Sequence, residues 1–258
     1  MININEFADF SIIGKRSSNQ DYYGISGNNL FVLCDGVGGN NKGEVASKLV
    51  TDAFIQEDLN GKALDDILCV AEDIVEQFIT DHPDAHGMAT TLTVLKILED
   101  KLLIGWVGDS RVYQFRSGVI IFKTLDHSWV NEALKYGIIS EEEAINHPKS
   151  NVITRAVQGS HKSVELEKNE ISDVVQGDYF LLCSDGILES WTDDELSELF
   201  SLSTSPNQII EKIKDKCCLH SKDNSTAIVL KVEEGNQPVS KKTKSIFSRI
   251  FKKKKNVS

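Results

Sequence analysis

Several features that mark particular classes of protein are missing from this sequence. Its five cysteines are odd in number, show no CxxC spacing and mostly lie within apolar runs, which excludes a paired disulfide framework and predicts reduced core residues inside a cell. No run reaches the ~20 apolar residues that a membrane-spanning helix needs. The N-terminus lacks both the basic start and the apolar stretch of a signal peptide. We therefore expect a cytoplasmic protein.

Proline is also scarce, with four residues in 258, and no Pro/Gly-rich linker divides the chain before its C-terminus. We expect one domain over residues 1–235. Residues 236–258 differ from it in charge, because they hold eight lysine and arginine residues and no acidic residue, which leaves the domain at −19 when the whole chain carries −11. Such an acidic body binds nucleic acid poorly, but it can bind cations where its carboxylates converge.

The hydrophobic pattern predicts strands in clusters, interrupted by pairs of helices. Short β-type runs indicate strands at residues 10–13, 22–25, 30–34, 164–167, 179–183 and 226–232. The stretch 90–123 has turn signals but no room for crossover helices, so it should form an antiparallel meander. Helical spacing of apolar residues covers 45–54, 64–78, 129–136, 141–146, 193–200 and 208–219. The expected fold class is α+β, with helices on the outer faces of antiparallel sheets.

Four aspartates share one local setting, an apolar strand that ends or begins at an aspartate with glycine or a small polar residue beside it. They are Asp35, Asp109, Asp185 and Asp223, and a fifth, Asp21, lies between two early strands. A single aspartate of this kind is explained as a turn or capping residue. The repetition favours a shared site, because neighbouring strand ends meet and several carboxylates there repel one another unless a cation neutralises them.

The ligand atoms of such a site suggest its chemistry. Carboxylates with no cysteine or histidine nearby favour Mg²⁺ or Mn²⁺ over zinc. Two such ions about 3.5 to 4 Å apart lower the pKa of a shared water and hold a phosphoryl group for in-line attack. Arg16, five residues before Asp21, offers a bidentate fork for phosphate oxygens, although taken alone it would be explained as a surface arginine. Phosphoester hydrolysis suits these residues best.

Eight motifs can be read together along the chain. They are GKRSSNQD (14–21), LFVLCDGVGG (30–39), GMATTL (87–92), GWVGDSRVY (105–113), DHSWV (126–130), HPKSNVITRAVQG (147–159), LLCSDGI (181–187) and DNSTAIVL (223–230). In this order they resemble the PP2C-type, metal-dependent protein phosphatases, and in particular their bacterial branch. The resemblance covers roughly residues 7–232, and the common order of the motifs carries it, since each motif alone is weak.

The resemblance implies a four-layer α-β-β-α sandwich, in which two packed antiparallel sheets are flanked by helices and the metal ions lie at one edge. It implies that Asp35 bridges two core Mn²⁺ or Mg²⁺ ions and that Gly36 adds a backbone carbonyl to one of them. Asp185 and Asp223 would complete the other ion. Asp35 and Asp185 are therefore expected both to bind metal and to be essential to catalysis.

Further roles follow from the same resemblance. Asp21 would act on the metals through water, Arg16 would be catalytic by clamping the substrate phosphate, and Asp109 would hold a third, weaker ion together with Asp185. Gln20 stands where many relatives carry a glutamate, so one negative charge is missing there. Val37 occupies the place of a histidine that eukaryotic relatives offer as a general acid, which shifts proton handling to metal-bound water.

Residues 126–159 resemble the flap subdomain, a variable segment that helps these enzymes to choose substrates. We expect His127 and His147 within it to have a substrate-facing or capping role rather than to bind metal. The implied function is hydrolysis of phosphoserine and phosphothreonine in substrates of a cognate Ser/Thr kinase, by a monomer. Two alternatives stay open: a non-catalytic phosphoprotein-binding regulator on the same fold, and a hydrolase of small phosphoesters or nucleotides. Polynucleotide substrates fit the acidic surface least.

The basic tail, residues 236–258, lies outside the phosphatase motifs. Within it Ile246, Phe247, Ile250 and Phe251 fall on one face of a short helix flanked by lysines. Such a segment can lie on an anionic membrane surface, where each basic residue contributes about 1 kcal/mol. A disordered, solubilising tail and a contact with an acidic partner protein are the other interpretations.

Overall fold

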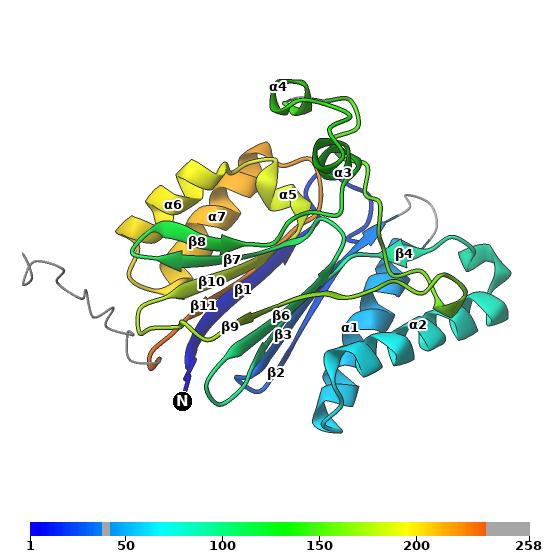
Figure 1. Ribbon diagram of the computed structural model, residues 1–258, viewed down its shortest axis with the longest axis horizontal. Helices are drawn as coiled ribbons and strands as arrows, with labels where there is room; N and C mark the ends of the chain where they lie inside the picture. Colours follow the sequence, from blue (N-terminus) through cyan, green and yellow to red (C-terminus); the bar gives the residue numbers. More distant parts are fainter. Residues whose placement is uncertain (38–41, 146, 236–258) are drawn as a thin grey trace, which may run out of the picture.

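The computed structural model describes residues 1–37, 42–145 and 147–235, which form two stacked antiparallel sheets between layers of helices (Figure 1). The first sheet has the strand order β1-β11-β10-β7-β8. Its strands are β1 (Glu6–Ile12), β7 (Arg111–Arg116), β8 (Val119–Lys123), β10 (Tyr179–Cys183) and β11 (Ser225–Lys231).

The second sheet has the order β2-β3-β5-β6-β9, and the short strand β4 pairs with the end of β3. Its strands are β2 (Asp21–Ser26), β3 (Leu30–Val37), β4 (Ala89–Thr90), β5 (Leu92–Ile97), β6 (Leu102–Val107) and β9 (Glu167–Ile171). The expected α+β class with two packed antiparallel sheets is confirmed.

Helices cover the outer face of each sheet (Figure 1). The second sheet is covered by α1 (Gly43–Leu59) and α2 (Leu64–Asp81), and the first by α6 (Asp193–Leu202) and α7 (Pro206–His220). The short elements are η1 (Pro83–Ala85), α3 (Trp129–Lys135), α4 (Glu141–Ala144), η2 (Ser160–Lys162) and α5 (Asp185–Leu188). None of the described helices is long and apolar enough to cross a bilayer.

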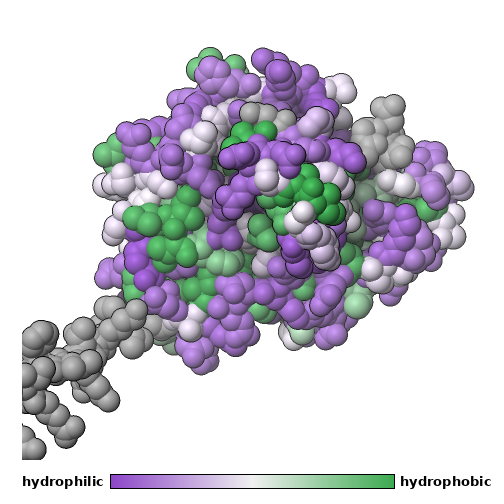
Figure 2. All heavy atoms as spheres, turned by 45° about the horizontal axis from the view of Figure 1, so that its top comes forward, coloured by the Kyte–Doolittle hydropathy of each residue, from purple (hydrophilic) through white to green (hydrophobic). Residues whose placement is uncertain are grey.

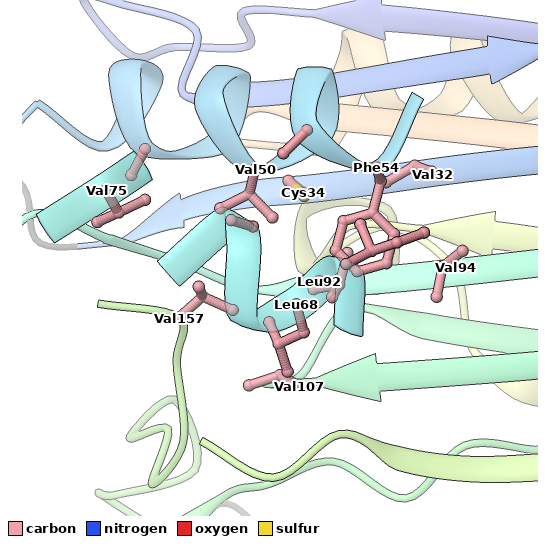
Figure 3. Close-up of a cluster of buried hydrophobic side chains, with 14 of the residues drawn as sticks. Val32, Cys34, Val50, Phe54, Leu68, Val75, Leu92, Val94, Val107 and Val157 are labelled. Carbon is pink, nitrogen blue, oxygen red and sulfur yellow. The ribbon is translucent and has the colours of Figure 1, made fainter. Parts of the chain in front are cut away.

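Alternation along the strands explains the layers. Leu30, Val32 and Cys34 of β3 pack against α1 and α2, as Figure 3 shows for Val32 and Cys34 beside Val50 and Phe54. The intervening residues Phe31 and Leu33 face the other sheet and are fully buried. Because successive strand residues point to opposite faces, one apolar strand can contribute to two hydrophobic layers. The sandwich therefore has three such layers, one between the sheets and one under each pair of helices.

The stretch 90–123, expected to form one meander, supplies strands to both sheets. The β5–β6 hairpin belongs to the second sheet and the β7–β8 hairpin to the first. The chain crosses between them at Gly108, which has a left-handed φ of +101° and where a Cβ would lie 2.6 Å from Thr91 Cγ2, so that only glycine fits. The prediction of a single meander was wrong. The crossing brings the next residue, Asp109, to the edge between the two sheets.

A second boundary also differs from the expectation. The strand predicted at 164–167 begins at Glu167 instead, as β9. The backbone N–H of Val164 donates to Glu72 Oε1 on α2, at 2.7 Å, and Leu166 packs into the core beneath that helix. Val164 and Leu166 therefore contact α2 and the core beneath it, and the strand begins only after them. The helices predicted at 129–136 and 141–146 are confirmed as α3 and α4 within a residue or two.

Strand β11 runs the length of the sandwich. Asp223 lies just before it, and beyond its other end Glu234 pairs with Asn3 near the N-terminus, at the end marked N in Figure 1. The basic tail, residues 236–258, falls outside the described residues, so the division into a domain and a tail stays a prediction.

Candidate active site at the edge of the two sheets

Strand ends from both sheets place the five aspartates at one end of the sandwich. Asp21 opens β2 and lies directly opposite Asp35 of β3 in the sheet register. Asp185 is the first residue of α5, immediately after β10, and Asp223 precedes β11. Asp109 follows β6 at the crossing between the sheets. Elements from four separate parts of the chain therefore converge there.

Four of these aspartates line one cavity of 160 Å³, and the fifth, Asp21, is buried beside it. The cavity is lined by Arg16, Gln20, Asp35, Gly36, Val37, Thr91, Asp109, Asn151, Ile153, Asp185, Asp223 and Asn224. Every residue predicted for the site is thus in the lining or next to it. The flap contributes Asn151 and Ile153, which sequence reasoning did not single out.

The carboxylates are held in an environment that opposes their charge. Burial raises the pKa of Asp35 well above its ordinary value, and the charges of Asp21 and Asp185 raise it further. Burial raises the pKa of Asp185 to about 7, with the charge of Asp109 adding to the effect. Burial also raises the pKa of Asp109 to about 6. Such a cluster stores repulsion that a bound cation relieves.

Asp21 is also a buried carboxylate with a raised pKa, although it lies beside the cavity rather than in its lining. Its side chain is 6% exposed, and one carboxylate oxygen, Oδ2, accepts a hydrogen bond of 2.8 Å from Ser184 Oγ. The other oxygen, Oδ1, is buried with no hydrogen-bond partner among the described residues. Burial raises the pKa of Asp21 to about 6. An unpaired buried carboxylate oxygen next to a polar cavity fits a role in holding water or a cation.

Arg16 lies across the mouth of the cavity. Its Nε donates to Asp223 Oδ1 at 2.8 Å and its Nη2 pairs with Oδ2 of the same carboxylate. Within the described residues, no three Asp, Glu, His or Cys side chains stand at metal-ligand spacing, and the guanidinium of Arg16 is paired with both carboxylate oxygens of Asp223. The donors predicted for the site, aspartate carboxylates and the Gly36 carbonyl, are all oxygen atoms, and such a set fits Mg²⁺ or Mn²⁺.

The residue Gln20, expected to leave a charge missing, has an acidic neighbour. Its side-chain amide donates to Glu44 Oε2 in the first turn of α1, at 3.3 Å. Glycine is required at Gly36 beside it, because a Cβ there would lie 2.4 Å from the backbone of Gly43 at the start of α1. The end of β3 and the start of α1 are therefore in direct backbone contact. Sequence reasoning did not predict Glu44 near the site.

Neutral polar residues hold the aspartates in place. Thr91 Oγ1 accepts from the backbone N–H of Asp35 at 2.9 Å and is hydrogen-bonded to Ser110 Oγ at 2.8 Å. Asn224 Oδ1 accepts from the backbone N–H of Gln20 at 2.8 Å, and its amide donates to two carbonyls of the loop that carries Arg16. Thr91 lies in the GMATTL motif and Asn224 in the DNSTAIVL motif, so these motifs could have pointed to both residues as part of the site.

The segment predicted to be a flap carries α3 and α4, which lie beyond the edge of the two sheets (Figure 1), and its residues Asn151 and Ile153 line the cavity. His147 stacks on Trp129 with ring centroids 4.8 Å apart. His127 is 6% exposed, does not line the cavity, and is not the cap of α3, which is Ser128; the expectation of a substrate-facing or capping role for it was wrong. Figure 2, which brings this end forward, shows hydrophobic patches set in a mostly hydrophilic surface.

Comparison with known proteins identifies this arrangement. The sequence profile of the family described as Protein phosphatase 2C matches residues 11–212. The serine/threonine phosphatase stp of Listeria monocytogenes is 33% identical over 199 residues, which cover 71% of this chain and 78% of that protein. The chain belongs to the protein phosphatase 2C family.

Other members of the protein phosphatase 2C family support the same fold. The serine/threonine protein phosphatase PstP of Mycobacterium tuberculosis is 33% identical over 205 residues, 76% of this chain, and the match spans only 39% of PstP. The crystal structure of the PstP catalytic domain in complex with two manganese ions superposes with a TM-score of 0.76 at 29% identity. It covers 88% of this chain and 98% of that one.

Proposed function

We propose that the chain hydrolyses phosphoserine and phosphothreonine esters in proteins with two Mn²⁺ or Mg²⁺ ions. The observation that carries the proposal is the convergence of Asp35, Asp109, Asp185 and Asp223 on one cavity together with Arg16. When bound, two such ions lower the pKa of a shared water and neutralise the phosphoryl oxygens. The relative crystallised with two manganese ions supports this choice of cofactor.

The carboxylates would hold the ions. Asp35, whose pKa is raised by burial and by the charges of the other four aspartates, lies among them and would suit the bridging position, with the Gly36 carbonyl as an added ligand. Asp185 and Asp223 approach from the first sheet and would complete the other ion. Asp21, with its unpaired Oδ1, would orient a water beneath them. These assignments follow the family resemblance, and the place of each residue in or beside the cavity supports them.

Arg16 would bind substrate. Its side chain is 59% exposed, so the guanidinium can turn from Asp223 toward a phosphate and form two parallel hydrogen bonds to its oxygens. Asp223 would then be released for cation binding. The apolar Val37 in the lining offers no proton to the leaving group, which leaves that proton to water in the cavity. Phosphorylated proteins would reach the cavity past the flap, through Asn151 and Ile153.

The test is phosphate release from a phosphothreonine peptide and a phosphotyrosine peptide with Mn²⁺, with Mg²⁺ and with EDTA. We expect metal-dependent turnover of the phosphothreonine peptide that Asp35→Asn and Asp185→Asn abolish, whereas Asp66→Asn on the exposed face of α2 leaves it unchanged. Phosphopeptide binding without turnover under any divalent metal would instead identify a non-catalytic regulator. Turnover of small phosphoesters alone would indicate a hydrolase of another class.

A further inference from the structure

His127 forms two hydrogen bonds with Gly108, the residue at which the chain crosses between the two sheets. Its backbone N–H donates to the carbonyl of Gly108 at 2.9 Å, and its ring Nδ1 accepts from the N–H of Gly108 at 3.0 Å. One residue thus satisfies both backbone groups of Gly108, the glycine whose left-handed conformation turns the chain toward Asp109. Asp109, which lines the cavity, is the next residue in the chain.

The contact requires one form of the imidazole ring. A backbone N–H can only donate, so Nδ1 must carry a lone pair and the proton must be on Nε2. That proton is donated to Glu167 Oε2, at 2.8 Å. The ring is also stacked on Trp106, with centroids 6.3 Å apart and planes at 14°. Trp106 and Glu167 are partners across β6 and β9, so the ring is fixed by two neighbouring strands of the second sheet.

The same residue joins the two ends of the flap. The carbonyl of His127 accepts from the N–H of Thr154 at 2.7 Å, and the N–H of Trp129 donates to the carbonyl of Val152 at 2.8 Å. Between these two bonds lies Ile153, which lines the cavity. A shift of His127 would therefore move Asp109 on one side of the cavity and the base of the flap on the other.

We propose that His127 is a positioning residue, which holds Asp109 and the base of the flap in the geometry that the reaction needs through the bond from Gly108 N–H to its Nδ1. Glu167 sets the ring orientation by accepting the proton on Nε2. The inference rests on the proposed function, because it assigns Asp109 a part in cation binding. It predicts that the atom at the Nδ1 position, rather than the size of the side chain, decides activity.

Three substitutions separate the two hydrogen bonds. His127→Asn places an amide oxygen where Nδ1 stands and keeps the acceptor for Gly108, but loses Glu167. His127→Gln can place an amide N–H near Glu167, but offers no acceptor at the Nδ1 position. His127→Ala loses both. Residues that orient metal ligands commonly change metal affinity or activity 10- to 100-fold, so we expect a loss of about that size in kcat for the alanine variant. The asparagine variant should recover most of it and the glutamine variant little.

The readouts are kcat and KM with p-nitrophenyl phosphate and with a phosphothreonine peptide, and Mn²⁺ affinity by calorimetry on the full chain. We expect kcat and Mn²⁺ affinity to follow the order Asn above Gln and Ala, with both substrates affected. Equal losses in all three variants, a better glutamine than asparagine variant, or an unchanged alanine variant would each overturn the proposal.

A measurement on the unmodified protein tests the geometry even where a variant does not fold. Nitrogen-15 spectra of the histidine ring and the Gly108 amide should show a proton on Nε2, none on Nδ1, and coupling between the Gly108 amide and Nδ1. A proton on Nδ1 at neutral pH would refute the assignment. Neither these spectra nor the Mn²⁺ affinities depend on turnover. An inactive wild-type chain would therefore refute the proposed function, and the Mn²⁺ affinities of the three variants together with the ring spectra would still test whether His127 positions Asp109.

Discussion

Removing one carboxylate from the cavity should stabilise the metal-free protein while it abolishes activity. Burial and the charge of Asp109 raise the pKa of Asp185 from 3.8 to about 7. Each pKa unit corresponds to about 1.4 kcal/mol, so ionised Asp185 costs the folded state up to about 4 kcal/mol above pH 7. Asp185→Asn keeps the shape and removes that charge. At about 2–4 °C per kcal/mol for a domain of this size, the melting temperature should rise by about 10 °C.

The sign of the pH dependence follows from the same shift. The pKa of Asp185 is higher in the folded than in the unfolded chain, so the folded state binds more protons between pH 3.8 and about 7. Stability of the metal-free protein should therefore fall as the pH rises through this window. In Asp185→Asn this fall should be smaller, and the two proteins should converge at the acidic end.

The assay is thermal unfolding in EDTA and in excess Mn²⁺, at pH 5 and at pH 8, followed by circular dichroism. Excess Mn²⁺ should raise the melting temperature of the wild type more than that of the variant, because a ligand that binds only the folded state stabilises it. Asp73→Asn, which removes an exposed carboxylate from the middle of α2, away from the helix ends, is the control and should change neither value. A variant that melts at or below the wild-type temperature in EDTA at pH 8 would refute the reasoning.

Two further substitutions test other parts of the site. Arg16→Lys keeps the charge but loses the bidentate contact with the phosphate. Because a hydrogen bond to a charged group contributes about 1.5–3 kcal/mol, KM for a phosphothreonine peptide should rise about tenfold or more in steady-state kinetics. An unchanged KM would show that Arg16 does not bind the substrate. Gly36→Ala places a Cβ 2.4 Å from the backbone of Gly43, which cannot move aside as a flexible side chain can, so urea unfolding should show a loss of about 3 kcal/mol or more. Gly61→Ala, where no atom lies within 4 Å, should cost about 1 kcal/mol for its left-handed conformation alone, and an equal loss in both variants would contradict the close contact at Gly36.

The layered fold could be predicted because its signals are local. Alternation in β3 and helical spacing in α2 each report a buried face, and aspartates at the ends of apolar runs mark where those runs stop. Asp35, Asp185 and Asp223 were found in this way, since each stands beside a strand that the sequence shows plainly. Their meeting at one cavity follows from strand ends of two packed sheets lying together.

What the sequence did not predict depends on contacts between distant segments. The turn at Gly108 sends β6 and β7 into different sheets, and the close approach to Thr91 that requires glycine there is reported by no local pattern. The buried position of His127 likewise depends on Trp106 and Glu167, 21 residues before it and 40 after it in the chain. Histidine in a flap-like segment suggested exposure, and the tertiary packing decided otherwise.

The course of β11 has a practical consequence for tethering this domain. The strand starts beside Asp223 at the cavity and is seven residues long, a rise of about 23 Å, before the chain reaches Glu234 and its partner Asn3. Both ends of the described chain are therefore on the side away from the cavity. A surface, fluorophore or second protein attached after Gly235, or ahead of Ile2, would leave the mouth of the cavity pointing outward and open to large phosphorylated proteins.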